Sequence, residues 1–377
     1  MELSWTDVAA WRARRHRLHE RAPADAMLQV VDELCGVQAQ VMSSAELTLW
    51  ARLESLDPDA VSTALWQDRT LVKTWAMRGT LHLLPAGDYA FWQAALSTQF
   101  VRFTKPSWGK AFGISAEELE EMIAGVRQAL AGEPLTREAL AAAVAEQSGN
   151  DHLAHALSDN WGSSLKPAAF RGALIFGPSN GQKVRFTEPD AWLGARDAVD
   201  PESAAVDVAR RYLAVHGPAT REDLARWWGV GPAVGGRMLK ALGDEAVEVV
   251  VEGAPMWMLA ADAGEAAGAP KTKTVRLLPG FDQYVLAATR HAAKLMPRED
   301  PELRPLVYRN QGWISAVLVV DGVMAGVWRF ERKGRRLPMA IEPFPGVKVG
   351  KAVRAAAEAE AEDAARFLGG ELSLTWL

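Results

Sequence analysis

The chain has 377 residues, of which 49% are apolar and 24% charged, a composition typical of globular proteins and sufficient for two to four modules. No apolar run approaches the ~20 residues that a membrane span requires, so we expect no membrane partner. The net charge of −5 argues against a uniformly basic surface, so any DNA-binding surface must come from local basic clusters. A single cysteine, Cys35, excludes an internal disulfide bond and favours a cytoplasmic location.

Two glutamines, Gln38 and Gln40, stand in the otherwise apolar segment 34–42. A buried amide is costly without polar partners. Each amide could bond a neighbouring backbone group, or the pair could line a small polar pocket. Apolar residues at helical spacing predict helices near 24–35 and 44–55, and Ser43 with Glu46 predicts a capping box for the second. The glutamines are therefore expected at a junction between helices, where both side chains could converge on one ligand.

Helices followed by hairpins recur along the next part of the chain. A helix near 58–67 precedes a predicted hairpin over 71–84. The segment Pro134–Ala141 is repeated as Pro218–Ala225, and in each copy a threonine can cap a short helix, with Asp223 completing a capping box in the second. Each copy follows a longer helix, the first of which Ser115 can begin as its N-cap, and precedes a two-stranded element, over 173–186 and 247–259 respectively. Helices followed by a hairpin are the plan of a winged-helix module.

A Gly/Ala-rich linker over 261–270 is expected to separate a last module, with strands over 316–330, a helix near 348–368 and a final strand. Basic residues surround Gly334 at a predicted hairpin tip, which suits contacts to phosphates or to a DNA groove. The N-terminal helix carries a second cluster. A run of charge is more often simply a solvated face. The candidate DNA-binding residues of the two clusters are Arg332, Lys333, Arg335, Arg336, Arg14, Arg15 and Arg17.

The chain resembles the bacterial winged-helix DNA glycosylases of the AlkZ type. The resemblance rests on Gln-x-Gln at 38–40, on the run Trp75–Pro85 and on Leu278–Asp282. Gln-x-Gln indicates the glycosylase branch, since a sister branch has aspartate at the second position. The resemblance implies a mainly helical α+β fold, with three tandem winged helices and a barrel-like mixed α/β module; the expected boundaries are 1–110, 111–197, 198–262 and 270–377.

Within the second motif, Arg78 and His82 become candidates for DNA contact. A structural role, tying the first hairpin to its neighbour, is the alternative for both residues.

The chemistry of glutamine narrows the activity that the motif can support. Glutamine does not titrate, so it cannot act as a general base, but it can orient a water molecule for attack. Orientation alone suffices when the leaving base already carries positive charge, as an N7- or N3-alkylated purine does. With the resemblance, this implies a monofunctional DNA glycosylase for bulky N-alkylpurine adducts or crosslinks, with Gln38 and Gln40 catalytic. Self-resistance to an alkylating natural product is a candidate role.

The expected partner is double-stranded DNA carrying alkylated purines, bound by a monomer without a cofactor or metal ion. Asp151, His152 and His155 have ligand-like spacing, but no matching second cluster accompanies them, so a surface helix is the better interpretation. The alternative function is a non-catalytic winged-helix protein that binds or regulates DNA, in which the glutamines are structural. Release of a base from alkylated DNA distinguishes the two hypotheses.

Overall fold

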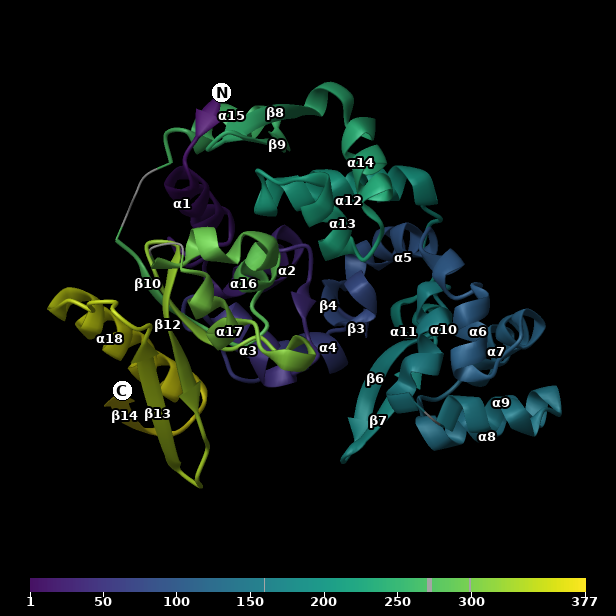
Figure 1. Ribbon diagram of the computed structural model, residues 1–377. Coiled ribbons are helices and arrows are strands. Elements are labelled where there is room, and N and C mark those ends of the chain that lie inside the picture. The colour runs from purple at the N-terminus through teal and green to yellow at the C-terminus, as the bar shows by residue number, and fades with distance from the viewer. Residues whose placement is uncertain (159, 270–272, 298–299) are drawn as a thin grey trace. The chain divides into compact units, whose positions relative to one another are not determined.

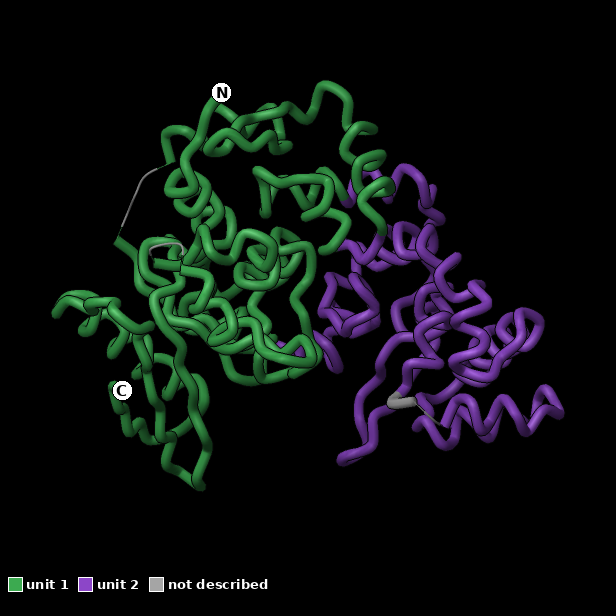
Figure 2. The backbone as a smooth tube through the Cα atoms, in the orientation of Figure 1, with its two compact units in different colours: residues 1–60, 209–227, 231–377 green, residues 61–208, 228–230 purple. Residues whose placement is uncertain are grey.

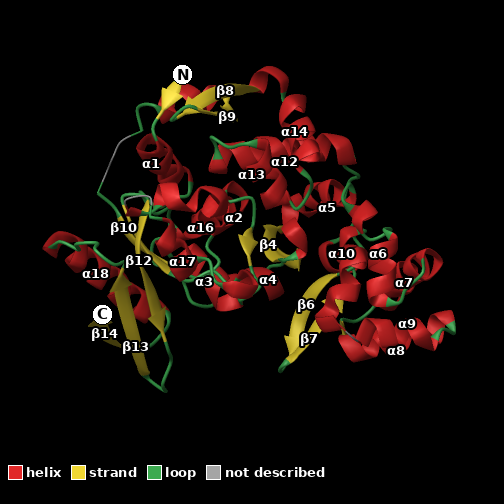
Figure 3. Ribbon diagram, in the orientation of Figure 1, coloured by secondary structure: helices red, strands yellow, loops and turns green. Residues whose placement is uncertain are grey.

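Runs of helices are separated by short strands in the described part of the chain (Figure 3). The computed structural model describes residues 1–158, 160–269, 273–297 and 300–377 (Figure 1). Two units are distinguished by their internal contacts (Figure 2): the first contains residues 1–60, 209–227 and 231–377, and the second contains residues 61–208 and 228–230.

The mainly helical α+β class is as predicted. Among the described residues, none of the helices combines the length and apolar character of a membrane span.

The N-terminal part of the first unit presents the glutamine segment. Its elements are β1 (Glu2–Leu3), α1 (Trp5–Arg15), α2 (Met27–Glu33), β2 (Val37–Gln38) and α3 (Met42–Trp50). The two predicted helices on either side of the glutamines are therefore confirmed. The predicted capping box at Ser43 is wrong. The chain is still extended at Val41, which makes no side-chain cap, and Met42 already begins the helix, so Ser43 falls inside the first turn.

The middle of the first unit contains the second copy of the sequence repeat. Its elements are the latter half of α12 (Pro201–His216), α13 (Arg221–Trp228), α14 (Pro232–Ala241), β8 (Ala246–Val251) and β9 (Ala254–Leu259). Thr220 and Asp223 form the predicted capping box, since each side chain accepts a hydrogen bond from the other residue's backbone N–H, at 2.9 and 3.2 Å. Strands β8 and β9 form the predicted antiparallel hairpin, and β1 adds to it in parallel.

The segment predicted as a Gly/Ala-rich linker is not a linker over most of its length. Residues Ala260–Ala266 form helix α15, in which Ala263 and Ala266 are buried. Alanine is the residue that stabilises a helix most, and its small side chain allows close packing, so composition alone was misleading here. Residue 270, the last of the predicted linker, lies outside the described residues.

The C-terminal part of the first unit is a five-stranded sheet of order β10-β11-β12-β13-β14 that curls into a half-barrel, as predicted. Its pairs are antiparallel except β13 and β14, which are parallel and joined by α18. The elements are β10 (Val275–Leu278), α16 (Gln283–Ala287), α17 (Arg304–Val307), β11 (Val317–Val320), β12 (Val323–Phe330), β13 (Arg336–Pro343), α18 (Lys351–Phe367) and β14 (Glu371–Trp376).

The second unit contains two of the predicted hairpins, β3/β4 and β6/β7. Trp75 of β3 packs against Phe176 of β6, with ring centroids 4.9 Å apart. Ser115 and Thr136 cap α7 and α8 as predicted. The elements are α4 (Ala60–Trp66), β3 (Leu71–Trp75), β4 (Leu81–Pro85), α5 (Tyr89–Ser97), α6 (Pro106–Phe112), α7 (Ala116–Ala129), β5 (Leu135–Thr136), α8 (Arg137–Ser148), α9 (Asp151–Ser158), α10 (Lys166–Phe170), β6 (Ile175–Asn180), β7 (Lys183–Thr187) and α11 (Pro189–Leu193).

A buried ion pair joins the N-terminal part of the first unit to its C-terminal part. The guanidinium of Arg52, just after α3, donates two hydrogen bonds to the carboxylate of Asp282, at 2.7 and 2.8 Å. Both side chains are completely inaccessible to solvent. Arg52 also donates to the Thr48 carbonyl oxygen, and Asp282 accepts from the backbone N–H of Tyr284. The pair therefore ties the end of α3 to the start of α16.

Breaking this pair should destabilise the protein strongly. Arg52→Ala leaves the Asp282 carboxylate buried without its cation, which costs about 3–5 kcal/mol of the free energy of unfolding. Urea denaturation measures the loss. The matched control is Arg210→Ala, because Arg210 forms an equally short ion pair with Glu245 at the surface, and that variant should unfold at nearly the wild-type urea concentration. Equal losses in the two variants would contradict a special role for the buried pair.

Candidate active site

The two glutamines lie on the short connection between α2 and α3, as the sequence predicted. Gln38 is the second residue of β2 and is only 6% exposed. Ala39 is buried, and Gln40 is exposed at the bend that precedes α3. The connection thus offers one amide in the protein interior and one at the surface, with a single small residue between them.

The backbone before Gln38 makes an unusual turn. Cys35 and Gly36 have φ angles of 57° and 87°, so two successive residues are left-handed at the end of α2. The N–H of Gly36 donates to the carbonyl oxygen of Val31 at 2.8 Å, which closes the helix end. Glycine adopts this region without steric cost, whereas a residue with a side chain costs about 1 kcal/mol or more. Strain of this kind accumulates at functional sites, and here it directs the chain into β2.

Gln283 contacts this turn, and sequence reasoning missed it. Its amide Nε2 donates to the carbonyl oxygen of Gly36 at 2.9 Å, and the side chain is 1% exposed. The run Leu278–Asp282 ends one residue before Gln283, but nothing local indicates that residue 283 reaches residue 36. The signal available in the sequence was Asp282, a favoured N-cap residue, directly before the amide of Gln283.

The predicted basic hairpin is confirmed as a structure. Strands β12 and β13 are joined by a tight turn at Gly334, closed by a bridge between Lys333 and Arg336. Lys333 forms an ion pair with Glu331 at 3.0 Å, and Arg332 donates to the Leu368 carbonyl oxygen. Arg335 and Arg336 are exposed and have no ion pair within the described part of the chain. These two arginines are the best placed of the cluster to meet phosphates.

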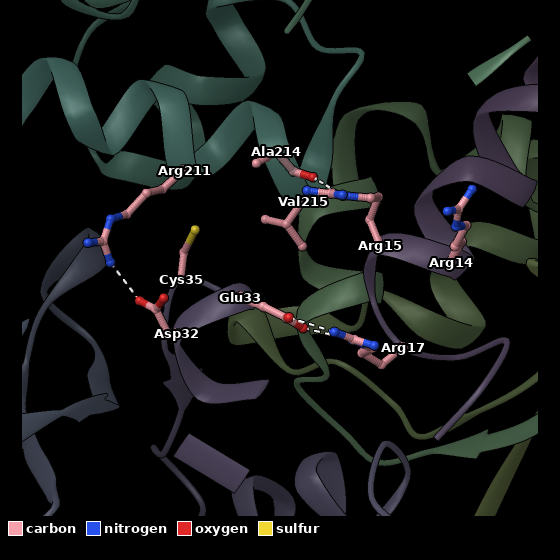
Figure 4. Close-up of a pocket in the computed structure, with 9 residues that line it drawn as sticks. All are labelled: Arg14, Arg15, Arg17, Asp32, Glu33, Cys35, Arg211, Ala214 and Val215. Carbon is pink, nitrogen blue, oxygen red and sulfur yellow. Dashed lines mark hydrogen bonds and ion pairs between the residues drawn. The ribbon is translucent and has the colours of Figure 1, made fainter. Parts of the chain in front are cut away.

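The N-terminal arginines are held by acceptors within the protein (Figure 4). Arg17 donates two hydrogen bonds to Glu33, at 2.6 and 2.8 Å, and these bonds raise the pKa of Arg17. Arg15 donates to the Ala214 carbonyl oxygen, and Arg14 lies 3.4 Å from Glu265. Their pocket is lined by Arg14, Arg15, Arg17, Asp32, Glu33, Cys35, Arg211, Ala214 and Val215. Two of its four arginines are paired with carboxylates that line the same pocket, Arg17 with Glu33 and Arg211 with Asp32, so this cluster is a weaker basis for DNA binding than its number of arginines indicates.

The two remaining candidates belong to the second unit. His82 is completely buried, and its Nδ1 lies 3.0 Å from the carbonyl oxygen of Thr80. Burial, together with the nearby charge of Arg78, lowers the pKa of His82 to about 3, so the imidazole is neutral at pH 7. These observations favour the structural alternative for His82. Arg78 is half-buried in the turn Met77–Gly79 of the β3/β4 hairpin.

Comparisons with known proteins agree with this architecture. The family described as DNA glycosylase AlkZ-like matches residues 31–367, which include the glutamine segment, Gln283 and the basic hairpin. The chain belongs to the AlkZ-like DNA glycosylase family. It is 38% identical over 378 aligned residues to an interstrand DNA cross-link repair glycosylase of Streptomyces sahachiroi, and 98% of each chain is covered. The solved structure of Streptomyces sahachiroi DNA glycosylase AlkZ is 36% identical, with a TM-score of 0.90 over all of both chains.

For this AlkZ-like protein, the hairpin should dominate the salt dependence of DNA affinity. Replacing both Arg335 and Arg336 with alanine should weaken duplex binding and lower the slope of log K against log salt by up to roughly 0.9 per lost phosphate contact. Titrations at several salt concentrations measure the slope. Adding Arg332→Ala and Lys333→Ala should extend the effect. Arg17→Gln is the control, since Arg17 is already neutralised by Glu33. An unchanged slope in the hairpin variants would show that the hairpin does not bind DNA.

Proposed function

We propose that the protein is a monofunctional DNA glycosylase that hydrolyses the N-glycosidic bond of bulky, cationic N-alkylpurines, with Gln38 and Gln40 orienting the attacking water. The observation that carries the proposal is the nature of the segment between α2 and α3: its polar side chains are amides, and Cys35 is its only titratable residue. Membership of the AlkZ-like DNA glycosylase family supports the same assignment. A segment without an amine also lacks the nucleophile of a bifunctional glycosylase.

The proposed reaction needs no proton donor for the base. An N7-alkylguanine carries a positive charge, and breaking the bond between C1′ and N9 moves that electron pair into the ring and neutralises it. The sugar passes through an oxocarbenium-like state, a water oxygen bonds to C1′, and the proton lost by the water goes to solvent. The amide oxygen of a glutamine can accept a hydrogen bond from this water and hold its attack trajectory, which is the contribution that orientation makes.

The proposed substrates extend to crosslinks, on which a hydrolase of this type would detach one strand at the alkylated purine. The relative from Streptomyces sahachiroi is named as an interstrand crosslink repair glycosylase, which supports this extension. Self-resistance to an alkylating natural product is the proposed biological setting. The protein would act in the cytoplasm, as a monomer on double-stranded DNA. Its proposed modules are three winged helices, over 1–110, 111–197 and 198–262, followed by a mixed α/β module over 270–377.

A non-catalytic DNA-binding function is the second candidate. The nearly complete burial of Gln38 favours it, because most buried amides bond to neighbouring groups of the protein. The two candidates differ in whether bound alkylated DNA loses its base.

Single-turnover excision of an N7-alkylguanine from duplex DNA tests the proposal. Gln38→Ala and Gln40→Ala should each slow excision by at least ~10-fold, because an orienting contact is lost. Affinity for intact DNA should change little, since phosphate contacts dominate that term. Gln40→Glu should retain activity, because a carboxylate can also accept from the water and stabilise the developing cation. Wild-type excision by both folded alanine variants would support the non-catalytic function.

A further inference from the structure

Two consecutive residues, Asp282 and Gln283, hold the start of the glutamine segment and the far end of helix α3, which follows that segment. Gln283 binds the Gly36 carbonyl oxygen, two residues before Gln38. Asp282 binds Arg52, just after the end of α3, the helix that follows Gln40. Both contacts are buried, and both come from the start of α16 (Figure 1).

The bond from Gln283 restrains the most flexible point of the segment. Gly36 lies at φ 87°, in a region that glycine enters and leaves more readily than any other residue. Its carbonyl oxygen defines the peptide plane between Gly36 and Val37, because the peptide unit is planar. A donor on that oxygen therefore fixes the direction in which the chain enters β2 and reaches Gln38.

Gln283 itself is rigidly mounted. Asp282 caps α16, since its Oδ1 accepts from the backbone N–H of Tyr284 at 2.9 Å, and its carboxylate is held by two hydrogen bonds from Arg52. The next residue, Gln283, is thus the first residue of a helix whose start cannot shift without breaking a buried ion pair. A side chain on such a support is suited to placing another group accurately.

Packing alone does not explain why residue 283 is a glutamine. Its Oε1 is buried and has no hydrogen-bond partner among the described residues. An unpaired buried acceptor destabilises a protein, and methionine has nearly the same length and would fill the space without that cost. What glutamine adds at this position is the donor to Gly36.

We propose that Gln283 is a positioning residue for the glycosylase reaction, which sets the backbone that carries Gln38 and Gln40 and does not touch the substrate. The inference rests on the proposed function. Removing the donor lets the peptide after Gly36 rotate, so the amides no longer hold the water on its line of attack. A displacement of about 1 Å at the reacting groups costs about 10- to 100-fold in rate.

The experiment compares Gln283→Met with a matched variant elsewhere. Gln99 is also a buried glutamine whose Nε2 donates to a backbone carbonyl oxygen, that of Trp228, at 3.2 Å. Both methionine variants lose a hydrogen bond to a backbone carbonyl oxygen, and Gln99→Met also loses the bond that the Gln99 Oε1 accepts from Arg102, so it is the more disruptive of the two. Thermal unfolding, affinity for intact duplex DNA and single-turnover release of an N7-alkylguanine are measured for each, below the unfolding temperature.

The proposal predicts that Gln283→Met slows base release by at least ~10-fold at unchanged DNA affinity, whereas Gln99→Met releases the base at the wild-type rate. If Gln283→Met does not fold, Gln283→Asn replaces it, because its amide is one methylene too short to reach Gly36 and should show the same loss. Wild-type release by a folded Gln283 variant, an equal loss in Gln99→Met, or a loss confined to DNA affinity would overturn the proposal. Absence of release by the wild-type protein would instead overturn the proposed function on which it rests.

Discussion

The buried contacts of Asp282 and Gln283 are the constraint on which the candidate site depends. The segment they hold is short, contains a glycine and begins at a strained turn, so its local sequence alone would leave it mobile. The ion pair between Arg52 and Asp282 has no access to solvent, and breaking it costs several kcal/mol. It therefore fixes the position of the start of α16, which carries Gln283. The first unit thus uses a contact between distant parts of the chain to give an accurate position to two neutral side chains.

Accuracy matters more here than reactivity. A carboxylate or imidazole at the site could move protons even in an imperfect geometry, whereas an amide contributes only through where it holds a water molecule. This explains why an amide-only segment would be accompanied by a rigid support, and why its proposed substrates are bases that already carry the charge needed to leave. The proposed DNA contacts of the basic hairpin differ in this respect, because exposed arginines that bind phosphates would need only to lie near them, at any of several positions.

Much of the fold could be predicted because its signals are local. The caps at Ser115, Thr136 and Thr220 and the hairpins that follow depend on neighbouring residues, and the repeated segment reinforced two of them. The junction that carries Gln38 and Gln40 was predicted from helical periodicity on either side. Where composition was the only guide, as for the alanine-rich helix α15, the prediction was wrong.

The supports of the site could not be predicted for a different physical reason. Gln283 and Gly36 are 247 residues apart, and Arg52 and Asp282 are 230 apart. Neither contact leaves a periodic or spacing signal in the sequence. The pairing of Arg17 with Glu33 is nearer in sequence but depends on the turn between α1 and α2, so the sequence did not reveal that Arg17 is ion-paired.

In the proposed reaction, neutral and accurately placed amides suffice because the departing base is already charged. The most direct test measures single-turnover base release from two duplexes that differ only at one residue: N7-alkylguanine, and 7-deazaguanine carrying the same alkyl group at position 7. The second base has the same bulk but no positive charge. We expect release of the base from the first duplex and none from the second. Comparable release from both would contradict the proposed reaction, because it would require a group that protonates or otherwise activates the neutral base.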